Sequence, residues 1–382
     1  MQNINNKLNK LQNCHQLREL HHYQSIKSGN KRFLIDNNGQ KFISFASNDY
    51  FSLANNRYII NAAIKAINQY GVGAVSSRLI SGNNILYQDL ENLIAKIKKT
   101  EASLVFSSGY ATAISVIPAL FDKNDLIIAD KLIHSCLIDG IKLSGAKMIR
   151  FIHNDISDCD KILQNNRHLF KKSVIISESV FSMDGDLGKV KNLAELAKKY
   201  NSALLIDDAH GLGIVNLENI DNYFTEEDDN FFLQMGTLSK AVAAIGGYVA
   251  GKNVVINYLK NFAKSLIYST ALPPAVLASS IIALQLIENH DFYQKIIKKA
   301  QYFCNLLNLN PPSSPIIPII IGDNEKTMQI ATSLKEQGFL VGAIRPPTVA
   351  INSSRLRITI NLNHSKQDIK NLATAIKKLH NF

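Results

Sequence analysis

The chain has 382 residues, 46% of them hydrophobic and 19% charged, which is enough for one large domain and a smaller one. Its apolar runs are too short to span a membrane, and residues 1–20 lack the apolar core of a signal peptide. The formal net charge of +11 comes from dispersed lysines without interleaved aromatic residues, so neither nucleic acid nor membrane is an expected partner. The four cysteines show no disulfide or metal-ligand spacing, which predicts a reduced protein of the cytoplasm without a bound metal.

The chain begins with a polar helical arm that extends to about residue 40 and leads into a hairpin. That hairpin is KRFLIDNNGQKFISF, residues 31–45, whose Asn-Asn-Gly turn separates two extended runs. Apolar residues at helical spacing then predict helices over 57–70 and 85–100.

Seven short apolar runs follow and alternate with amphipathic helices. Several of the runs are continuous, which is typical of strands buried on both faces. We therefore predict an α/β fold with a seven-stranded, mostly parallel sheet in a large domain, residues 41–285. The expected strands are 102–108, 125–130, 147–151, 173–179, 202–208, 231–237 and 246–251.

A smaller α+β domain is predicted over residues 286–382, with residues 1–40 forming the arm and the start of the hairpin. A long helix is expected after Pro273-Pro274 and should continue toward residue 308. The pattern beyond it is strand, helix, strand, strand and helix, over 316–321, 327–337, 339–344, 355–362 and 365–379.

Lys240 is the single cation of the segment GTLSKAVAAIGGYVAG, residues 236–251, which otherwise resembles buried packing. A buried ammonium is costly unless it is paired or deprotonated, and a lysine of lowered pKa can form a Schiff base. An isolated lysine more often packs its stem and extends its charged end to water, so the segment alone leaves both interpretations open.

Other polar side chains follow neighbouring strands, at the edge where ligands bind in an open α/β sheet. SALLIDDAHGLG places Asp207 and His210 after one strand, and Glu178 ends the strand before it. VFSSGYATA opens a helix at Gly109, and a helix N-terminus is a ready phosphate site. Structural capping or a metal pair would explain single motifs, but together with a lysine they match what pyridoxal phosphate requires.

The motifs resemble, in order, those of the α-oxoamine synthases, which are fold-type I pyridoxal phosphate enzymes, and the resemblance covers about residues 33–380. Within that family the chain looks most like the branch that serves biotin synthesis. The stretches that carry it are FASNDYFSLA, SSRLISGN, FSSGYATA, DKLIHSCLIDG, ESVFSMDGDLG, LIDDAHGLG, GTLSKA, GGYVAG, IYSTALPP, AIRPPTV and RLRITI.

The resemblance implies pyridoxal phosphate as cofactor and a role for each matching residue. Lys240 would form the Schiff base, Asp207 would hold the pyridinium nitrogen, and His134 would stack on the ring; these three are the expected catalytic residues. Ser269 and Thr270 would reach the phosphate of a second subunit, which implies a homodimer with shared sites. The remaining cofactor contacts would be Ser108, Gly109, Tyr110, Ser182, His210 and Thr237.

Substrate-binding residues are implied in the same way. Arg357 of RLRITI resembles the arginine that binds the amino-acid carboxylate, beside Asn48, and Thr348 lies in the matching AIRPPTV stretch. The N-terminal arm of the family carries a substrate arginine, for which Arg18 is the candidate if a small insertion follows it. Without the insertion, His21 or His22 takes that place.

Two departures from the family pattern stand out. The chain has GVGAVSSR where the family often has GxGxGGSR, so the backbone near Val75 and Ser76 is expected to differ. Cys136 replaces a serine, which we interpret as a neutral packing exchange.

The implied reaction joins L-alanine to a pimeloyl thioester, on CoA or on acyl carrier protein, with loss of CO2 to give 8-amino-7-oxononanoate. Sister enzymes that use glycine with acetyl-CoA or succinyl-CoA are the nearest alternative. A basic, non-catalytic nucleic-acid-binding protein on the same fold is the alternative from another class.

Overall fold

The computed structural model describes residues 1–28, 31–224 and 230–380. Contacts between residues divide the chain into two compact units. The larger unit consists of Ser52–Phe181 and Leu187–Asp291, and the smaller one of Met1–Phe51, Ser182–Asp186 and Phe292–Phe382. The domains predicted from the sequence, with boundaries near residues 40 and 285, stay a prediction, because the two units are defined by contacts and not by independent folding.

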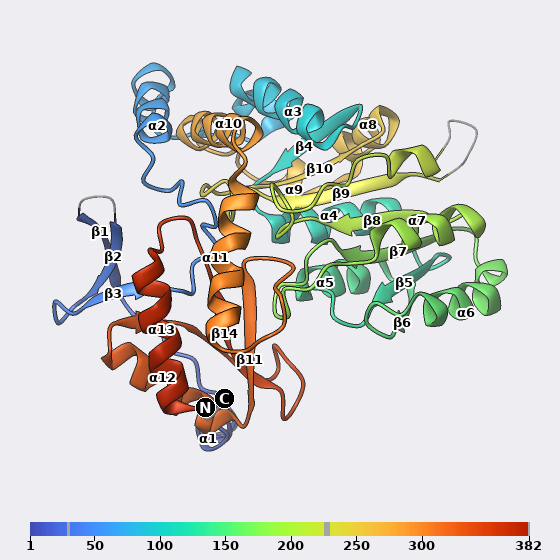
Figure 1. Ribbon diagram of the computed structural model, residues 1–382. Coiled ribbons are helices and arrows are strands. Elements are labelled where there is room, and N and C mark those ends of the chain that lie inside the picture. The colour runs from blue at the N-terminus through green and yellow to red at the C-terminus, as the bar shows by residue number, and fades with distance from the viewer. Residues whose placement is uncertain (29–30, 225–229, 381–382) are drawn as a thin grey trace. The chain divides into compact units, whose positions relative to one another are not determined.

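The larger unit is built on a seven-stranded sheet in the order β4-β10-β9-β8-β7-β5-β6 (Figure 1). β10 runs antiparallel to β4 and β9, and the other neighbours are parallel. Each of the seven predicted apolar runs forms one of these strands, so the predicted mostly parallel sheet is confirmed. The strands are β4 (Ala102–Phe106), β5 (Leu126–Asp130), β6 (Lys147–Phe151), β7 (Ser173–Glu178), β8 (Ala203–Asp207), β9 (Phe232–Thr237) and β10 (Gly247–Gly251).

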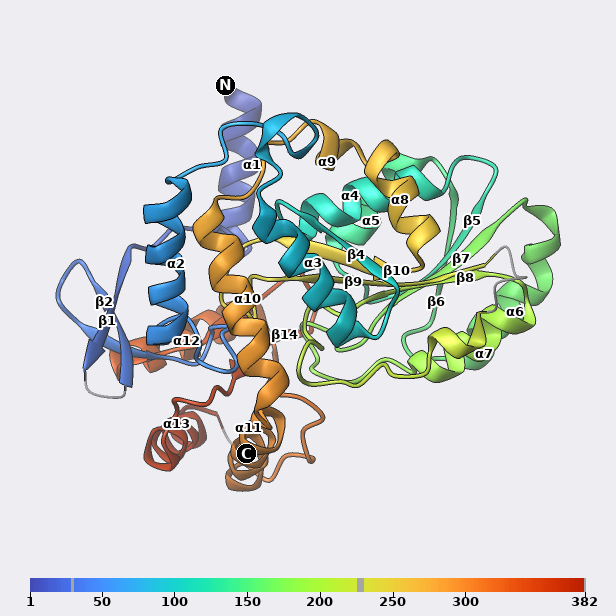
Figure 2. The same ribbon diagram turned by 90° about the horizontal axis from the view of Figure 1, so that it is seen from above.

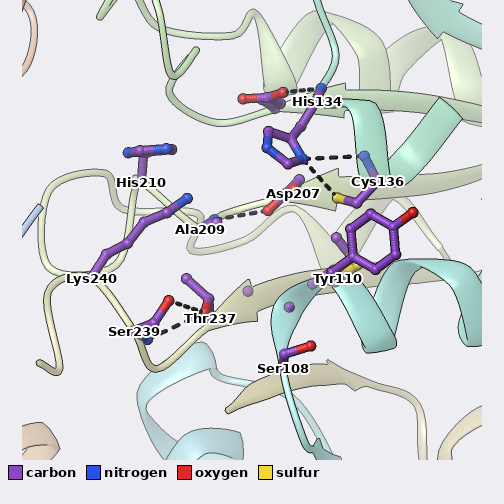
Figure 3. Close-up of a pocket in the computed structure, with 14 residues that line it drawn as sticks. Ser108, Tyr110, His134, Cys136, Asp207, Ala209, His210, Thr237, Ser239 and Lys240 are labelled. Atoms are coloured by element: carbon purple, nitrogen blue, oxygen red, sulfur yellow. Dashed lines mark hydrogen bonds between the residues drawn. The ribbon is translucent and has the colours of Figure 1, made fainter. Parts of the chain in front are cut away.

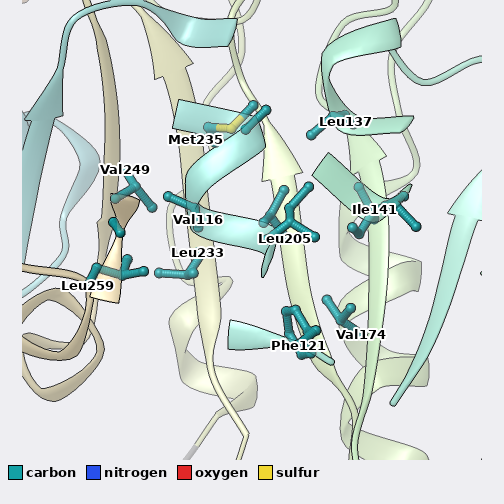
Figure 4. Close-up of a cluster of buried hydrophobic side chains, with 14 of the residues drawn as sticks. Val116, Phe121, Leu137, Ile141, Val174, Leu205, Leu233, Met235, Val249 and Leu259 are labelled. Atoms are coloured by element: carbon teal, nitrogen blue, oxygen red, sulfur yellow. The ribbon is translucent and has the colours of Figure 1, made fainter. Parts of the chain in front are cut away.

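Both faces of this sheet are buried, because successive strand residues point to opposite sides. Ile127 and Ala129 of β5 belong to one core cluster, with α4 (Gly109–Leu120), α5 (Ser135–Ser144), α8 (Asn253–Phe262) and α9 (Lys264–Ile267) (Figure 4). Leu126 and Ile128 belong to the other, with α6 (Ile156–Asn166) and α7 (Val190–Lys199). Because both faces of these strands are buried, the strands appear in the sequence as continuous apolar runs.

Three more helices of the larger unit pack together: α2 (Arg57–Tyr70), α3 (Ile85–Lys98) and α10 (Pro274–Asn289). α10 contacts both α2 and α3 (Figure 2). The expected single helix toward residue 308 is wrong, because α10 ends at Asn289 and His290 is extended. Asn, His and Asp are weak helix formers, and the chain resumes as α11 (Phe292–Leu306) in the smaller unit.

The smaller unit contains two sheets. The predicted hairpin is confirmed as β2 (Lys31–Asp36) and β3 (Lys41–Ser44), and β1 (Tyr23–Ser28) pairs with β2. β12 (Phe339–Leu340) joins β3 in parallel, whereas β13 (Gly342–Ile344) and β11 (Ile316–Gly322) flank β14 (Ser354–Thr359) in the second sheet. The predicted strand 339–344 is therefore divided between two sheets. Besides α11, the smaller unit contains the helices α1 (Gln2–Asn13), α12 (Asn324–Glu336) and α13 (Lys366–Leu379). None of the helices described in the chain combines the length and the apolar character needed to cross a membrane.

Candidate active site

A cavity of about 220 Å³ lies in the larger unit and gathers residues at and just after the ends of five strands of the sheet, β4, β5, β7, β8 and β9 (Figure 3). Eight residues predicted to contact a cofactor line it: Ser108, Gly109, Tyr110, His134, Asp207, His210, Thr237 and Lys240. Six further residues complete the wall: Cys136, Glu178, Ala209, Met235, Gly236 and Ser239.

Asp207 ends β8 and presents a buried carboxylate to this cavity. One carboxylate oxygen accepts a hydrogen bond of 2.9 Å from the backbone N–H of Ala209. Burial raises the pKa of Asp207, while the positive charge of Lys240, the Ala209 N–H and His134 act in the opposite direction. A cationic group placed in the cavity would further favour the ionised carboxylate.

Lys240 lies on the short loop that joins β9 to β10. Thr237 at the end of β9 holds this loop, because its hydroxyl donates to the carbonyl of Gly246 at 2.9 Å and accepts from the N–H of Ser239 at 3.2 Å. The Lys240 side chain is half-buried and extends toward the end of β8 that carries Asp207 (Figure 3). The single cation of the small-residue segment is thus directed into a cavity rather than packed in the core.

His134 caps the N-terminus of α5. Its Nδ1 accepts a hydrogen bond of 3.2 Å from the N–H of Cys136, so the ring proton is assigned to Nε2. Burial lowers the pKa of His134, which keeps the imidazole neutral near pH 7. Cys136 does more than fill space, because its thiol sulfur lies 2.9 Å from the same Nδ1 and lines the cavity.

Glu178 is a residue of the cavity wall to which the sequence assigned no role. Its carboxyl group is buried at the end of β7 and accepts a hydrogen bond of 2.6 Å from the backbone N–H of His134. Burial raises its pKa well above the ordinary value, and the nearby charge of Asp207 raises it further. The sequence placed Glu178 at a strand end within the motif ESVFSMDGD, but it gave no indication of the contact with His134.

The N-terminus of α4 forms another part of the wall. Ser108 caps this helix, its hydroxyl accepting a hydrogen bond of 3.0 Å from the N–H of Ala111. The first turn rests on β10 at Gly247, where a Cβ would lie 2.5 Å from the Ser108 carbonyl oxygen and 2.6 Å from the Gly109 nitrogen. A glycine at this position lets the helix bring its N–H groups and positive dipole end to the cavity.

Ser182 and two predicted substrate residues lie together in the smaller unit. Arg357 of β14 is buried, and its Nε donates to the Ser182 carbonyl oxygen at 2.6 Å. Its Nη1 donates to the side-chain oxygens of Asn48 and Thr359, both at 3.0 Å. Its Nη2 is buried and has no hydrogen-bond partner in the described part of the chain. A guanidinium nitrogen of this kind is suited to receive an anionic oxygen.

Arg18 and Thr348 form a separate pair in the same unit. The Arg18 guanidinium donates to the Thr348 hydroxyl at 3.4 Å. His21 and His22 are both exposed and lie beyond this pair along the chain. Arg18 thus lies beside Thr348, and the choice between Arg18, His21 and His22 as a substrate residue stays a prediction.

Ser269 and Thr270 do not line the 220 Å³ cavity of their own chain. They line a different small cavity, beside Arg78. Thr270 forms an isolated antiparallel bridge with Ser77, so this loop is held beside the segment in which the chain departs from the family pattern.

Comparisons with known proteins place these residues in a family. Residues 40–376 match the profile of the family described as aminotransferase class I and II. A putative 8-amino-7-oxononanoate synthase of Parvibaculum lavamentivorans is 43% identical over 342 residues, which are 89% of this chain and 88% of that protein. The 8-amino-7-oxononanoate synthase of Beijerinckia indica is 42% identical over 90% of each chain.

The chain belongs to the 8-amino-7-oxononanoate synthase family. The resemblance to the α-oxoamine synthases is thereby confirmed, and with it the expected class of enzyme, a pyridoxal phosphate-dependent acyltransferase.

Solved structures agree with this membership in the 8-amino-7-oxononanoate synthase family. The crystal structure of the 8-amino-7-oxononanoate synthase from Francisella tularensis has a TM-score of 0.73 at 27% identity, covering 88% of this chain and 97% of that one. A serine palmitoyltransferase with its pyridoxal phosphate internal aldimine has a TM-score of 0.89 at 22% identity, covering 99% and 97%. The latter shows the fold, and the expected fold type I is confirmed.

The cavity has the groups that pyridoxal phosphate requires. A carboxylate, Asp207, suits the pyridine nitrogen, the amine of Lys240 suits the aldehyde carbon, and the N-terminus of α4 suits the phosphate. Because these groups share one cavity, the residues present fit the family's cofactor.

Proposed function

We propose that the chain condenses L-alanine with a pimeloyl thioester, with loss of CO2, to give 8-amino-7-oxononanoate. The observation that carries this proposal is the shared cavity of Lys240, Asp207 and His134 in a member of the 8-amino-7-oxononanoate synthase family. Names of the relatives give the product, and alanine and the pimeloyl thioester are the substrates from which that product is built with loss of CO2.

Bound pyridoxal phosphate supplies an electron sink for the carbanion that forms at the amino-acid α-carbon. Asp207 would hold the proton on the cofactor's pyridine nitrogen, since its buried carboxylate is stabilised by a cation. The N–H groups at the N-terminus of α4, with Thr237 nearby in the cavity wall, would bind the phosphate. His134, whose neutral imidazole carries a proton on Nε2, would contact the ring.

Lys240 would hold the cofactor and would then serve as the base. Its half-buried amine would take the α-proton of alanine and later return a proton to the product. The Thr237 hydroxyl bonds to Gly246 and Ser239 hold the loop and so limit the positions that this amine can take.

Arg357 binds the carboxylate of alanine. Its guanidinium is held by Ser182 and Asn48, and its buried Nη2 would receive a substrate oxygen. Arg18 and Thr348, which form a pair of their own in the smaller unit, would supply further substrate contacts.

The working unit is a homodimer with shared sites. Two features support it: Ser269 and Thr270 are separate from the cavity of their own chain, and large apolar side chains are exposed on the larger unit. Ile80 and Tyr268 are each 81% exposed and Val72 is 78% exposed, which is typical of a surface that a second subunit covers.

A substrate panel tests the proposed reaction. The purified holoenzyme is given L-alanine or glycine with pimeloyl, acetyl or succinyl thioesters, each on CoA and on acyl carrier protein, and CO2 release and the product mass are measured. We expect alanine with a pimeloyl thioester to give the highest kcat/KM, and Lys240→Ala to be inactive throughout. Preferred use of glycine with a short acyl group would assign the chain to a sister synthase instead.

A further inference from the structure

A buried ion pair lies next to Asp207 but outside the cavity. Asp208, the following residue, pairs with Lys98 at the end of α3, and their side chains are 0% and 7% exposed. The hydroxyl of Ser179 donates to the other oxygen of the Asp208 carboxylate at 2.5 Å. The carboxylate is thus held on one oxygen by a cation and on the other by a hydroxyl, within the core of the larger unit.

The surroundings of this pair are shaped for it. A Cβ at Gly211 would lie 2.1 Å from an Asp208 carboxylate oxygen and 2.2 Å from the Ser179 hydroxyl, so a glycine is needed there. Gln234 of β9 donates to the Lys98 carbonyl at 3.0 Å, which ties the end of α3 to the sheet. Burial alone would lower the pKa of Lys98, but Asp208 and then Tyr248 raise it above the ordinary value, so the lysine is a cation.

Stability alone does not explain an ion pair at this depth. Desolvation of two buried charges commonly cancels their attraction, and apolar residues of similar volume are often as stable or more so. The position of the pair supplies another explanation, because Asp207 and Asp208 are consecutive and Asp207 faces the cofactor cavity. An uncompensated Asp208 would place a second negative charge beside Asp207 in a medium of low dielectric constant.

We propose that Lys98 is a positioning residue of the cofactor site: by neutralising Asp208, it leaves Asp207 as the ionised carboxylate that holds the cofactor's pyridine nitrogen. This inference rests on the proposed function, because it assigns Asp207 to that nitrogen. The role is electrostatic, since Lys98 acts on the cofactor through Asp208 and Asp207 and does not line the cavity.

Other charged and titratable groups around Asp207 also influence its pKa. Burial raises the pKa of Asp207 and Asp208 adds to this rise, whereas Lys240 and His134 act in the opposite direction. Glu178 at the end of β7 and Tyr248 of β10 also interact with Asp207, and the pKa of each is raised, first of all by burial. At pH values where Asp208 is ionised, loss of Lys98 therefore acts in one direction: it strengthens the influence of Asp208 and raises the pKa of Asp207.

The test measures the affinity of the apoprotein for pyridoxal phosphate from pH 5 to 9, by equilibrium dialysis and by the visible absorbance of the bound cofactor. Affinity requires ionised Asp207, so it falls on the acid side of that group's pKa. In Lys98→Met we expect the midpoint of this fall to move up by about one pH unit, which is about a tenfold loss of affinity on the acid side. Lys98→Arg keeps the cation and should keep the wild-type midpoint.

Asp208→Asn should shift the pH midpoint in the direction opposite to Lys98→Met, because it removes the anion of the pair and leaves the cation. Its midpoint should move to lower pH, and Lys98→Met/Asp208→Asn should return close to the wild-type position. Lys98 also lines a second cavity of about 370 Å³. In Asp208→Asn, where the Lys98 ammonium has lost its partner, this cavity would give the ammonium room for hydration. If Lys98→Met does not fold, Asp208→Asn and the double variant still decide the question.

Two outcomes separate this inference from the proposed function. Variants of Lys98 and Asp208 that change the free energy of unfolding but leave the midpoint in place would show that the pair is structural, and would overturn the inference alone. Asp207→Asn is the reference variant: if it binds pyridoxal phosphate with the pH profile of the wild type, the role of Asp207 itself is wrong.

Discussion

Glu178 shows how one buried side chain makes stability depend on pH. Its pKa is raised well above 4.5, chiefly by burial, so the native state keeps this proton at pH values where the unfolded chain has lost it. The stability that this proton contributes is therefore fully present below the pKa that Glu178 has in the unfolded chain. It is lost as the pH rises through the pKa that Glu178 has in the native state. In Glu178→Gln, whose amide oxygen can still accept from the His134 N–H, this loss disappears. The free energy of unfolding of the variant relative to the wild-type apoprotein should rise from pH 5 to 8, by about 1.4 kcal/mol for each pH unit of the shift. Urea unfolding measures it, and a difference independent of pH would contradict the assignment.

Val75 has an unusual backbone conformation, and whether the family's backbone differs here stays a prediction. It has φ +51° and a side chain that is 93% exposed, at a position where the family often has glycine. A β-branched residue in the left-handed region is strained by about 1–2 kcal/mol. Val75→Gly should therefore raise the free energy of unfolding by about 1 kcal/mol, in spite of the added chain entropy of glycine. Ile351→Gly is the control, since Ile351 is also β-branched and is 81% exposed without a positive φ, and it should lower stability. Equal losses in both variants would show that Val75 is unstrained.

At the scale of elements, local pattern and tertiary pairing differ in how far the sequence predicts them. Strands buried on both faces are continuous apolar runs, so all seven strands of the large sheet could be predicted. Eight of the predicted cofactor contacts line one cavity at the ends of these strands, and their roles stay predictions. The parallel pairing of β12 with β3 could not be predicted, because Phe339 and Ile43 are far apart in the chain and short strands carry no signal of their partner. The role of Glu178 was missed for a similar reason: its contact with His134 joins two elements.

Gly247 links the packing of two elements to cofactor binding. In Gly247→Ala the new Cβ would lie 2.4 Å from the Thr112 hydroxyl and 2.5 Å from the Ser108 carbonyl oxygen, so the first turn of α4 must move. We expect the affinity for pyridoxal phosphate to fall by about tenfold or more, because the helix N–H groups leave the phosphate position. Gly73→Ala is the control, since the nearest heavy atom to its Cβ is 4.0 Å away. Unchanged affinity in Gly247→Ala, measured by dialysis, would remove α4 from the phosphate site.

At the scale of the whole molecule, the predicted homodimer can be tested by mixing two defective subunits. Lys240→Ala subunits are combined with Ser269→Ala/Thr270→Ala subunits under conditions of proven exchange. If the sites are shared, one site of each heterodimer contains both defects and the other contains none, so about a quarter of wild-type activity should return on random exchange. Each parent alone should remain impaired. Failure to complement despite exchange, or a fully active monomer, would leave Ser269 and Thr270 as part of a structural turn.

The central claim, that this chain holds pyridoxal phosphate through Lys240 in the cavity beside Asp207, is tested most directly by reductive trapping. The wild-type holoenzyme is treated with borohydride, digested and mapped by mass spectrometry. The structure predicts one reduced cofactor adduct, on Lys240, and none at this position in Lys240→Ala, in which the fold is retained. An adduct on another lysine, or retained cofactor that borohydride does not attach to the chain, would contradict the claim.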